Sequence, residues 1–192
     1  YLNVKVTSIG KSIEIFKATG SPKEFISNFQ IENICGTHGI GHTRMATESA
    51  VTISGAHPFS TGLDQCLVHN GSLSNHNNIR RKLLREGITT ETQNDSEVAA
   101  AYISNQLSHN KNIDTALENG LKELDGFYNF IVGTLNGFAV LRDPIACKPA
   151  VMAETANYVA FGSEFRALVQ LPDIDSAVIW EPDPGKVYSW SH

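Results

Sequence analysis

The 192-residue sequence has few cysteines, no long apolar run and no strongly basic stretch. Its three cysteines are an odd number with no close pair, which indicates reduced thiols and a cytoplasmic location. No apolar run approaches the roughly 20 residues that span a bilayer, so we expect no membrane segment. The formal charge of −5 and the even mixing of signs argue against a nucleic-acid partner.

Motifs for a metal or a dinucleotide are also missing. Five histidines fall in the first half of the chain, but no Cys-x-x-Cys or His-Glu-x-x-His pattern accompanies them. We therefore expect no metal site. The glycines of 36–41 have the wrong spacing for a dinucleotide loop, and no βαβ pattern follows them.

The length and a hydrophobic content of 41% suffice for one well-filled core. Residues 1–192 are therefore predicted to form a single domain. Tyr1 cannot be an initiator residue, so we expect the sequence to be a processed, truncated or incomplete product.

The apolar pattern predicts strands, then helices, then strands again. The helices begin with Ser21-Pro22, where Pro suits the first turn, and three more follow. The helix expected over 76–86 should bury Ile79, Leu83 and Leu84. Asn136-Gly137 between two apolar runs is a strong hairpin signal. The expected strands cover two stretches of 1–17, then 36–46, 64–70, 127–132, 137–142, 150–153, 158–161, 178–180 and 186–190. The later helices are expected over 76–86, 96–108 and 113–124.

This order separates the helices from largely antiparallel sheets, which defines an α+β fold. The apolar strands of the second half suggest burial on both faces. We therefore expect two sheets stacked between helix layers, an αββα sandwich.

Arg44 and Asp95 are candidate ligands for a small charged molecule. The planar guanidinium of Arg44 suits a carboxylate, because two parallel hydrogen bonds fix orientation as well as charge. A surface ion pair is the alternative interpretation for Arg44. Asp95 stands where a helix is expected to begin, so it could act as the N-cap, bind an ammonium, or do both.

The segment His69-Asn70-Gly71 has two interpretations. Asn-Gly is a common type I′ hairpin turn. However, an apolar strand precedes it and a predicted helix follows it, which does not suit a hairpin. The alternative is an oxyanion hole made by the Asn70 side-chain N–H and the Gly71 backbone N–H.

Taken together, these segments resemble the class II glutamine amidotransferase domain, an N-terminal-nucleophile (Ntn) hydrolase. The family's glutamine-binding strand is similar to Gly-His-Thr-Arg-Met-Ala-Thr at 41–47. Ala-His-Pro at 56–58, His-Asn-Gly at 69–71 and Asn-Asp-Ser-Glu at 94–97 follow in the family's order. Gly-Ser-Glu at 162–164 resembles a later turn, and 184–187 resembles the closing hairpin.

The resemblance implies a role for each of these residues. Arg44 would hold the α-carboxylate of L-glutamine and Asp95 its α-ammonium. Asn70 and Gly71 would form the catalytic oxyanion hole, and Thr47 and His57 would support the pocket. The family's fold is the four-layer αββα Ntn sandwich, and no cofactor is needed in this chain.

The family's nucleophile is an N-terminal cysteine whose α-amine acts as the base, and no such residue precedes Tyr1. We therefore expect the nucleophile-bearing first strand to be missing from this sequence. Cys35 is followed by glycine, as in the family, but its nitrogen is an amide and not a base.

The resemblance implies a glutaminase subunit that delivers ammonia to a partner synthase. Within the family, it is nearest to the subunits of glutamate-synthase-like and N-methylglutamate synthase assemblies, which suggests a flavin-dependent partner. The sequence leaves formation of a homo-oligomer open. Two alternatives remain: a glutamine-binding or regulatory subunit without a nucleophile, and an Ntn hydrolase acting on another amide.

Overall fold

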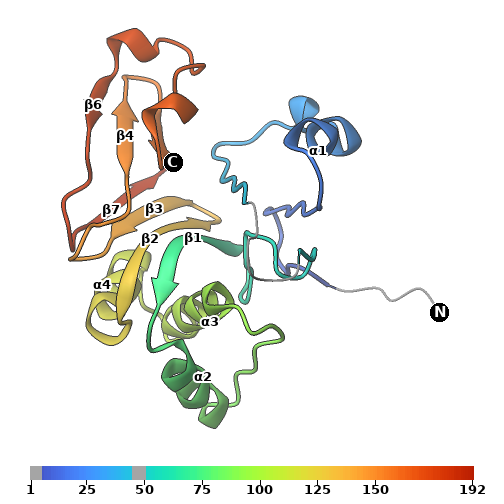
Figure 1. The fold of residues 1–192 in the computed structure, drawn as a ribbon, viewed down its shortest axis with the longest axis vertical. Coiled ribbons are helices and arrows are strands. Elements are labelled where there is room, and N and C mark those ends of the chain that lie inside the picture. Colours follow the sequence, from blue (N-terminus) through green and yellow to red (C-terminus); the bar gives the residue numbers. More distant parts are fainter. Residues whose placement is uncertain (1–5, 45–50) are drawn as a thin grey trace.

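The structure is a computed structural model that describes residues 6–44 and 51–192 (Figure 1). Four α-helices and seven strands lie in this part of the chain, with three short 3₁₀ helices between them. The α-helices are α1 (Pro22–Phe29), α2 (His76–Arg85), α3 (Asp95–Ser108) and α4 (Ile113–Glu123). The strands are β1 (Gln65–Leu73), β2 (Gly126–Thr134), β3 (Gly137–Arg142), β4 (Val151–Glu154), β5 (Val159–Gly162), β6 (Val178–Trp180) and β7 (Val187–Ser191).

The strands form two antiparallel sheets. The larger has the order β1-β2-β3-β7 and the smaller the order β5-β4-β6. Because side chains alternate across a strand, neighbouring residues of β1 face different layers. Leu67 and Leu73 pack in the core shared with α2, α3 and α4, whereas Val68 packs in the core between the two sheets.

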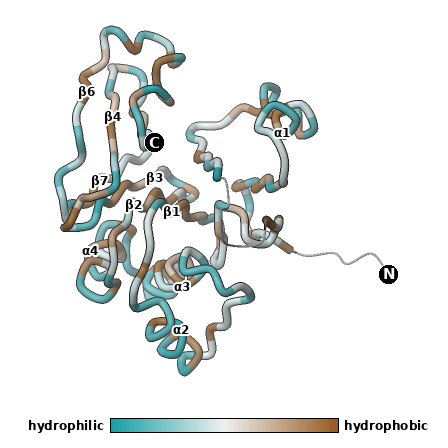
Figure 2. Tube along the Cα trace, viewed as in Figure 1, coloured by the Kyte–Doolittle hydropathy of each residue, from teal (hydrophilic) through white to brown (hydrophobic). Residues whose placement is uncertain are grey.

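The layers therefore run from helices through the larger sheet to the smaller sheet (Figure 1). Hydrophobic segments follow the strands of the larger sheet and the inner side of α3 (Figure 2). The inter-sheet core centres on Val68, Ile131, Val140 and Met152. Between β5 and β6 the described chain forms two 3₁₀ turns, Phe165–Ala167 and Ile174–Ser176. The predicted α+β arrangement with antiparallel sheets is confirmed.

All four predicted helices are present, and each begins within one residue of its expected start or cap. One detail of α2 was predicted wrongly. Ile79 and Leu83 are 6% and 2% exposed, but Leu84 is 58% exposed, because it lies one helical step beyond the buried stripe. The first two hairpins are also confirmed, as β2–β3 and β4–β5.

The strands predicted in 1–17 and 36–46 are not found in the residues described there. Between residues 6 and 17 the backbone makes one bridge, from Ile9 to Leu63. Instead, the Asp64 carboxylate accepts the backbone N–H groups of Lys11, Ser12 and Ile13 at 2.8–3.1 Å. These donors are therefore bound by a side chain, which leaves them unavailable for a strand ladder.

The segment 36–44 runs past the larger sheet without joining it. Its three glycines weaken a strand, because they lose much backbone entropy and offer no side chain to pack. Ile40 fixes the segment by packing at the inter-sheet core, where it lies against Gly133.

The closing hairpin predicted around 184–187 is also wrong. β6 pairs with β4 in the smaller sheet and β7 pairs with β3 in the larger, so the loop between them crosses from one sheet to the other. Arg142 holds this crossing, because its guanidinium donates to the Pro182 carbonyl and pairs with Glu181 at 3.1 Å. Within the described ranges, no helix has the length and apolar character needed to cross a bilayer.

Candidate functional site

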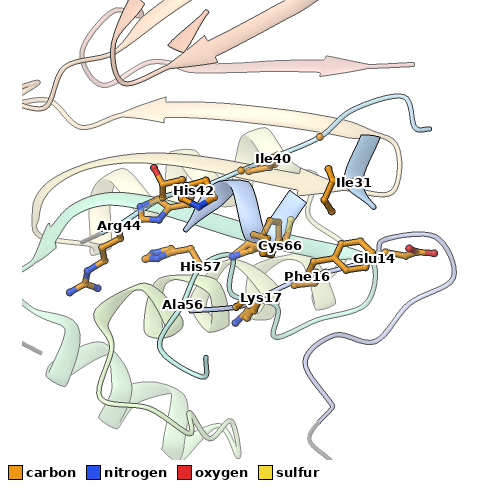
Figure 3. A pocket seen from close by; sticks show the side chains of 18 of the residues that line it. Glu14, Phe16, Lys17, Ile31, Ile40, His42, Arg44, Ala56, His57 and Cys66 are labelled. Carbon is orange, nitrogen blue, oxygen red and sulfur yellow. The ribbon is translucent and has the colours of Figure 1, made fainter. Parts of the chain in front are cut away.

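A cleft of about 1850 Å³ lies between the N-terminal segments and the main body of the protein. Most of its wall comes from residues 12–44, residues 51–58 and the turn 92–95 that leads into α3, and Cys66, His76 and Leu135 complete it. Figure 3 shows Arg44, His42 and His57 grouped at one end, and Phe16 and Ile31 at the other. The polar end of the cleft is thus the part that can recognise charged groups.

His42 and His57 stack on each other in this polar end. Their ring centroids are 4.2 Å apart, and the rings are inclined by 30°. Both nitrogens of His57 are buried, and neither has a hydrogen-bond partner among the described residues. Burial, together with the nearby charges of His42, His69, Arg44 and Lys17, lowers the pKa of His57 to about 2. His57 is therefore a neutral imidazole near pH 7.

Asp95 is the first residue of α3, but it is not the N-cap. Asn94 caps the helix, since its side chain accepts the Ser96 N–H at 2.9 Å. Asp95 instead accepts the backbone N–H of Leu73 through Oδ2 at 2.9 Å. Its Oδ1 makes one long contact of 3.4 Å with the Ser96 hydroxyl. Asp95 lines the cleft, and its side chain is 22% exposed.

His69 stands beside this carboxylate on the helix side of β1. Its Nδ1 lies 2.9 Å from the Ser96 hydroxyl and 3.8 Å from Asp95 Oδ1. Burial lowers the pKa of His69 to about 4, although the Asp95 charge opposes the shift. Because His69 is neutral near pH 7, its 3.8 Å approach to Asp95 is not an ion pair.

Asn70 and Gly71 lie inside β1, opposite Asn129 and Tyr128 of β2, so the hairpin-turn interpretation of this segment is wrong. The Asn70 amide donates to the Ser163 hydroxyl at 3.2 Å. Gly71 has φ = +151°, and a Cβ there would lie 2.0 Å from the Phe127 carbonyl oxygen. Only glycine fits this position.

The structure thus brings Arg44, His57 and Asp95 to the wall of one cleft. Asn70 and Gly71 are on the neighbouring strand, and they do not line the cleft formed by the described residues. Thr47 lies outside the described residues.

The sequence interpretation missed two residues that hold this site. Glu97 is buried and binds the turn that precedes Asp95, and Ser163 binds Asn70. Both belong to segments that resembled family motifs, which was the only available signal for them.

Comparison with known proteins identifies the family of this domain. Residues 42–170 match the model of the glutamine amidotransferase domain. The chain belongs to this family. The matched range contains Arg44, Asn70 and Asp95, and it ends after the Ser163 turn.

Relatives of this glutamine amidotransferase domain are found in bacteria and archaea. The chain is 64% identical to the glutamine amidotransferase-like protein GlxB of Rhizobium meliloti, over 99% of this chain and 63% of that protein. It is 29% identical to an amidophosphoribosyltransferase of Methanocaldococcus jannaschii, over 94% of this chain and 38% of that protein. The chain therefore spans less than two thirds of the length of these curated relatives.

The fold of the amidotransferase domain also has counterparts among solved structures. The glutamine phosphoribosylpyrophosphate amidotransferase of B. subtilis superimposes with a TM-score of 0.71 at 25% identity, over 88% of this chain and 38% of that chain. The class II glutamine amidotransferase assignment and the Ntn-type α+β sandwich are thereby confirmed.

Proposed function

We propose that the protein hydrolyses the side-chain amide of L-glutamine and passes the ammonia to a partner synthase. The observation that carries this proposal is that Arg44 and Asp95 both line the same cleft. A free α-amino acid presents one carboxylate and one ammonium, and these two side chains have the complementary charges.

In the proposed reaction, Arg44 holds the α-carboxylate and Asp95 the α-ammonium, with Thr47 and His57 supporting the pocket. The nucleophile is an N-terminal cysteine thiolate of the whole protein. It attacks the side-chain carbonyl carbon, and the oxyanion takes hydrogen bonds from Asn70 and Gly71. The C–N bond breaks, and ammonia leaves with a proton that the cysteine α-amine has taken from the thiol. Water then cleaves the thioester to give glutamate and the free thiol.

The cysteines within this sequence do not suit that role. Cys66 is buried, and burial raises the pKa of its thiol, which disfavours the thiolate. Cys35 and Cys147 are exposed, but their nitrogens are peptide amides and cannot act as bases. All three are free thiols, and for this reason we place the reaction in the reducing cytoplasm.

The proposed ammonia acceptor is a flavin-dependent synthase of the glutamate-synthase or N-methylglutamate-synthase kind. This part rests on the sequence resemblance of 43–50, 147–150 and 180–182 to that branch. A shared assembly would place the partner near the cleft, so that ammonia need not cross bulk water.

The test measures ammonia and glutamate released from glutamine by the natural full-length protein, alongside Asp95→Asn. The side-chain amide that this substitution introduces can still accept the Leu73 N–H, so the change removes the charge and spares the contact. We expect the KM for glutamine to rise about 10- to 100-fold, the loss typical of a charged hydrogen bond, with kcat little changed.

Three other outcomes would reject the proposal. Glutamine binding without ammonia release would indicate a regulatory subunit. Equal turnover of asparagine or simple amides would indicate an Ntn hydrolase for another substrate. Unchanged glutamine kinetics in Asp95→Asn would remove Asp95 from the ammonium site.

A further inference from the structure

The polar end of the inter-sheet layer holds the proposed oxyanion donor. The β1–β2 register pairs Val68 with Ile131, and two residues further along it pairs Asn70 with Asn129. Since residues two apart point to the same face, Asn70 and Asn129 continue the row that faces the smaller sheet. The apolar core between the sheets therefore ends in two amides.

Asn129 shows that this end is enclosed. It is 0% exposed, and its amide nitrogen donates to the Pro149 carbonyl at 2.8 Å. Its Oδ1 is buried without a hydrogen-bond partner among the described residues. Such an orphan acceptor is costly, so water does not readily reach Asn129, whereas Asn70 and Ser163 are half-buried.

Ser163 reaches Asn70 from the other sheet. It follows β5, and its hydroxyl accepts the Asn70 side-chain N–H at 3.2 Å across 93 residues of sequence. An amide nitrogen carries two hydrogens, so one bound to Ser163 leaves the other to point elsewhere. This contact fixes the torsion of the amide and thereby the direction of the second N–H.

The turn that carries Ser163 is itself held tightly. Gly162 pairs with Val151 in the smaller sheet. A Cβ on Gly162 would lie 3.0 Å from the Glu164 carbonyl oxygen and 3.3 Å from the side chain of Leu168, which is buried. The backbone has little room to shift, so the Ser163 hydroxyl has a defined position.

We propose that Ser163 is a positioning residue that aims the Asn70 amide at the developing oxyanion. This inference rests on the proposed glutaminase function and deepens it. Ser163 does not touch the substrate; it acts through Asn70, and it couples the smaller sheet to the reacting centre. A donor aimed in advance is worth more in the transition state than one that must first be oriented.

The test is a double-mutant cycle on glutaminase kinetics of the natural full-length protein, with Ser163→Ala, Asn70→Ala and the pair. We expect Ser163→Ala to lower kcat about 3- to 10-fold, the value of one neutral hydrogen bond, with an unchanged KM. Asn70→Ala should lower kcat about 10²–10³-fold. Adding Ser163→Ala to Asn70→Ala should then cost nothing further, because the residue that Ser163 positions is gone.

Ser163→Thr keeps the hydroxyl and should restore most of the rate. Thr155→Ala is the matched control, since it removes a hydroxyl that bonds only within the β4–β5 turn, and it should leave kcat unchanged. Equal losses from Ser163→Ala with and without Asn70 would show a general structural role and overturn the proposal. An unaffected kcat in Ser163→Ala would do the same. Absence of glutaminase activity in the unmodified protein would instead reject the proposed function itself.

Discussion

The buried carboxylate of Glu97 accepts both the backbone N–H and the hydroxyl of Thr92, each at 2.6 Å. Its other oxygen accepts the Glu91 N–H at 2.8 Å. From the opposite side, Arg80 donates to the Thr92 carbonyl at 2.7 Å. Glu97 of α3 and Arg80 of α2 therefore both hold the turn that precedes Asp95 on the cleft wall.

Glu97→Gln should loosen this turn while preserving its shape. The amide presents one acceptor in place of two, so one of the three donors loses its partner. We expect a rise of about tenfold in the KM for glutamine and a much smaller change in kcat, because Asp95 acts in binding. Steady-state glutaminase kinetics measure both. Glu118→Gln, an exposed change on α4, is the control, and an equal effect there would refute the role of Glu97.

Arg44→Ala should weaken recognition of the substrate carboxylate. We expect kcat/KM for glutamine to fall about 30-fold or more, which corresponds to losing a charge-assisted contact. The same variant should treat the α-methyl ester of glutamine as the unmodified protein does, because the ester has no carboxylate to lose. Equal losses for both substrates would assign Arg44 to a structural contact.

Gly71→Ala should destabilise β1 directly. Its Cβ would overlap the Phe127 carbonyl, and φ = +151° is strained for an L residue. We expect the free energy of unfolding to fall by about 2–4 kcal/mol in urea denaturation. Gly39→Ala, where nothing lies within 4 Å of the new Cβ, should change it by less than about 0.5 kcal/mol. Similar losses for the two variants would contradict this geometry.

The buried histidines should make stability depend on pH. His57 and His69 have folded pKa values of about 2 and about 4, below the ordinary value of 6.5. Between pH 6.5 and 4 the unfolded chain therefore binds more protons than the folded chain, and stability falls as the pH falls. The slope is up to about 1.4 kcal/mol per pH unit for each histidine.

Urea titrations at pH 7, 6 and 5 measure this dependence. His57→Gln should flatten the slope, because one of the two groups no longer titrates. A slope that stays the same in His57→Gln would show that His57 is solvated in the folded protein.

The sequence predicts those parts of the fold that depend on local pattern. The α2–α4 helices and the β2–β3 hairpin follow from helical periodicity and from Asn136-Gly137, which act over a few residues. The failures involve distant partners. Asp64 captures the backbone of 11–13, and Arg142 holds the crossing between the sheets, and neither effect is visible in a local window.

In the candidate site, too, local motifs were predictable and contacts between distant segments were not. Arg44, His57 and Asp95 could be named from segments that resemble a family, and the structure places them on one cleft. The supports of the site could not be predicted, because Ser163 and Asn70 meet only after two sheets have stacked.

The Asp64 carboxylate binds residues 11–13 through their backbone N–H groups and not through their side chains. Lys11, Ser12 and Ile13 all donate backbone N–H groups to Asp64, so substitutions other than proline keep these donors. Gly10 is different, since a Cβ on it would lie 2.2 Å from the Asp64 carboxylate. The sequence of 11–13 can thus vary during evolution while this attachment is kept, provided that Asp64 and Gly10 remain.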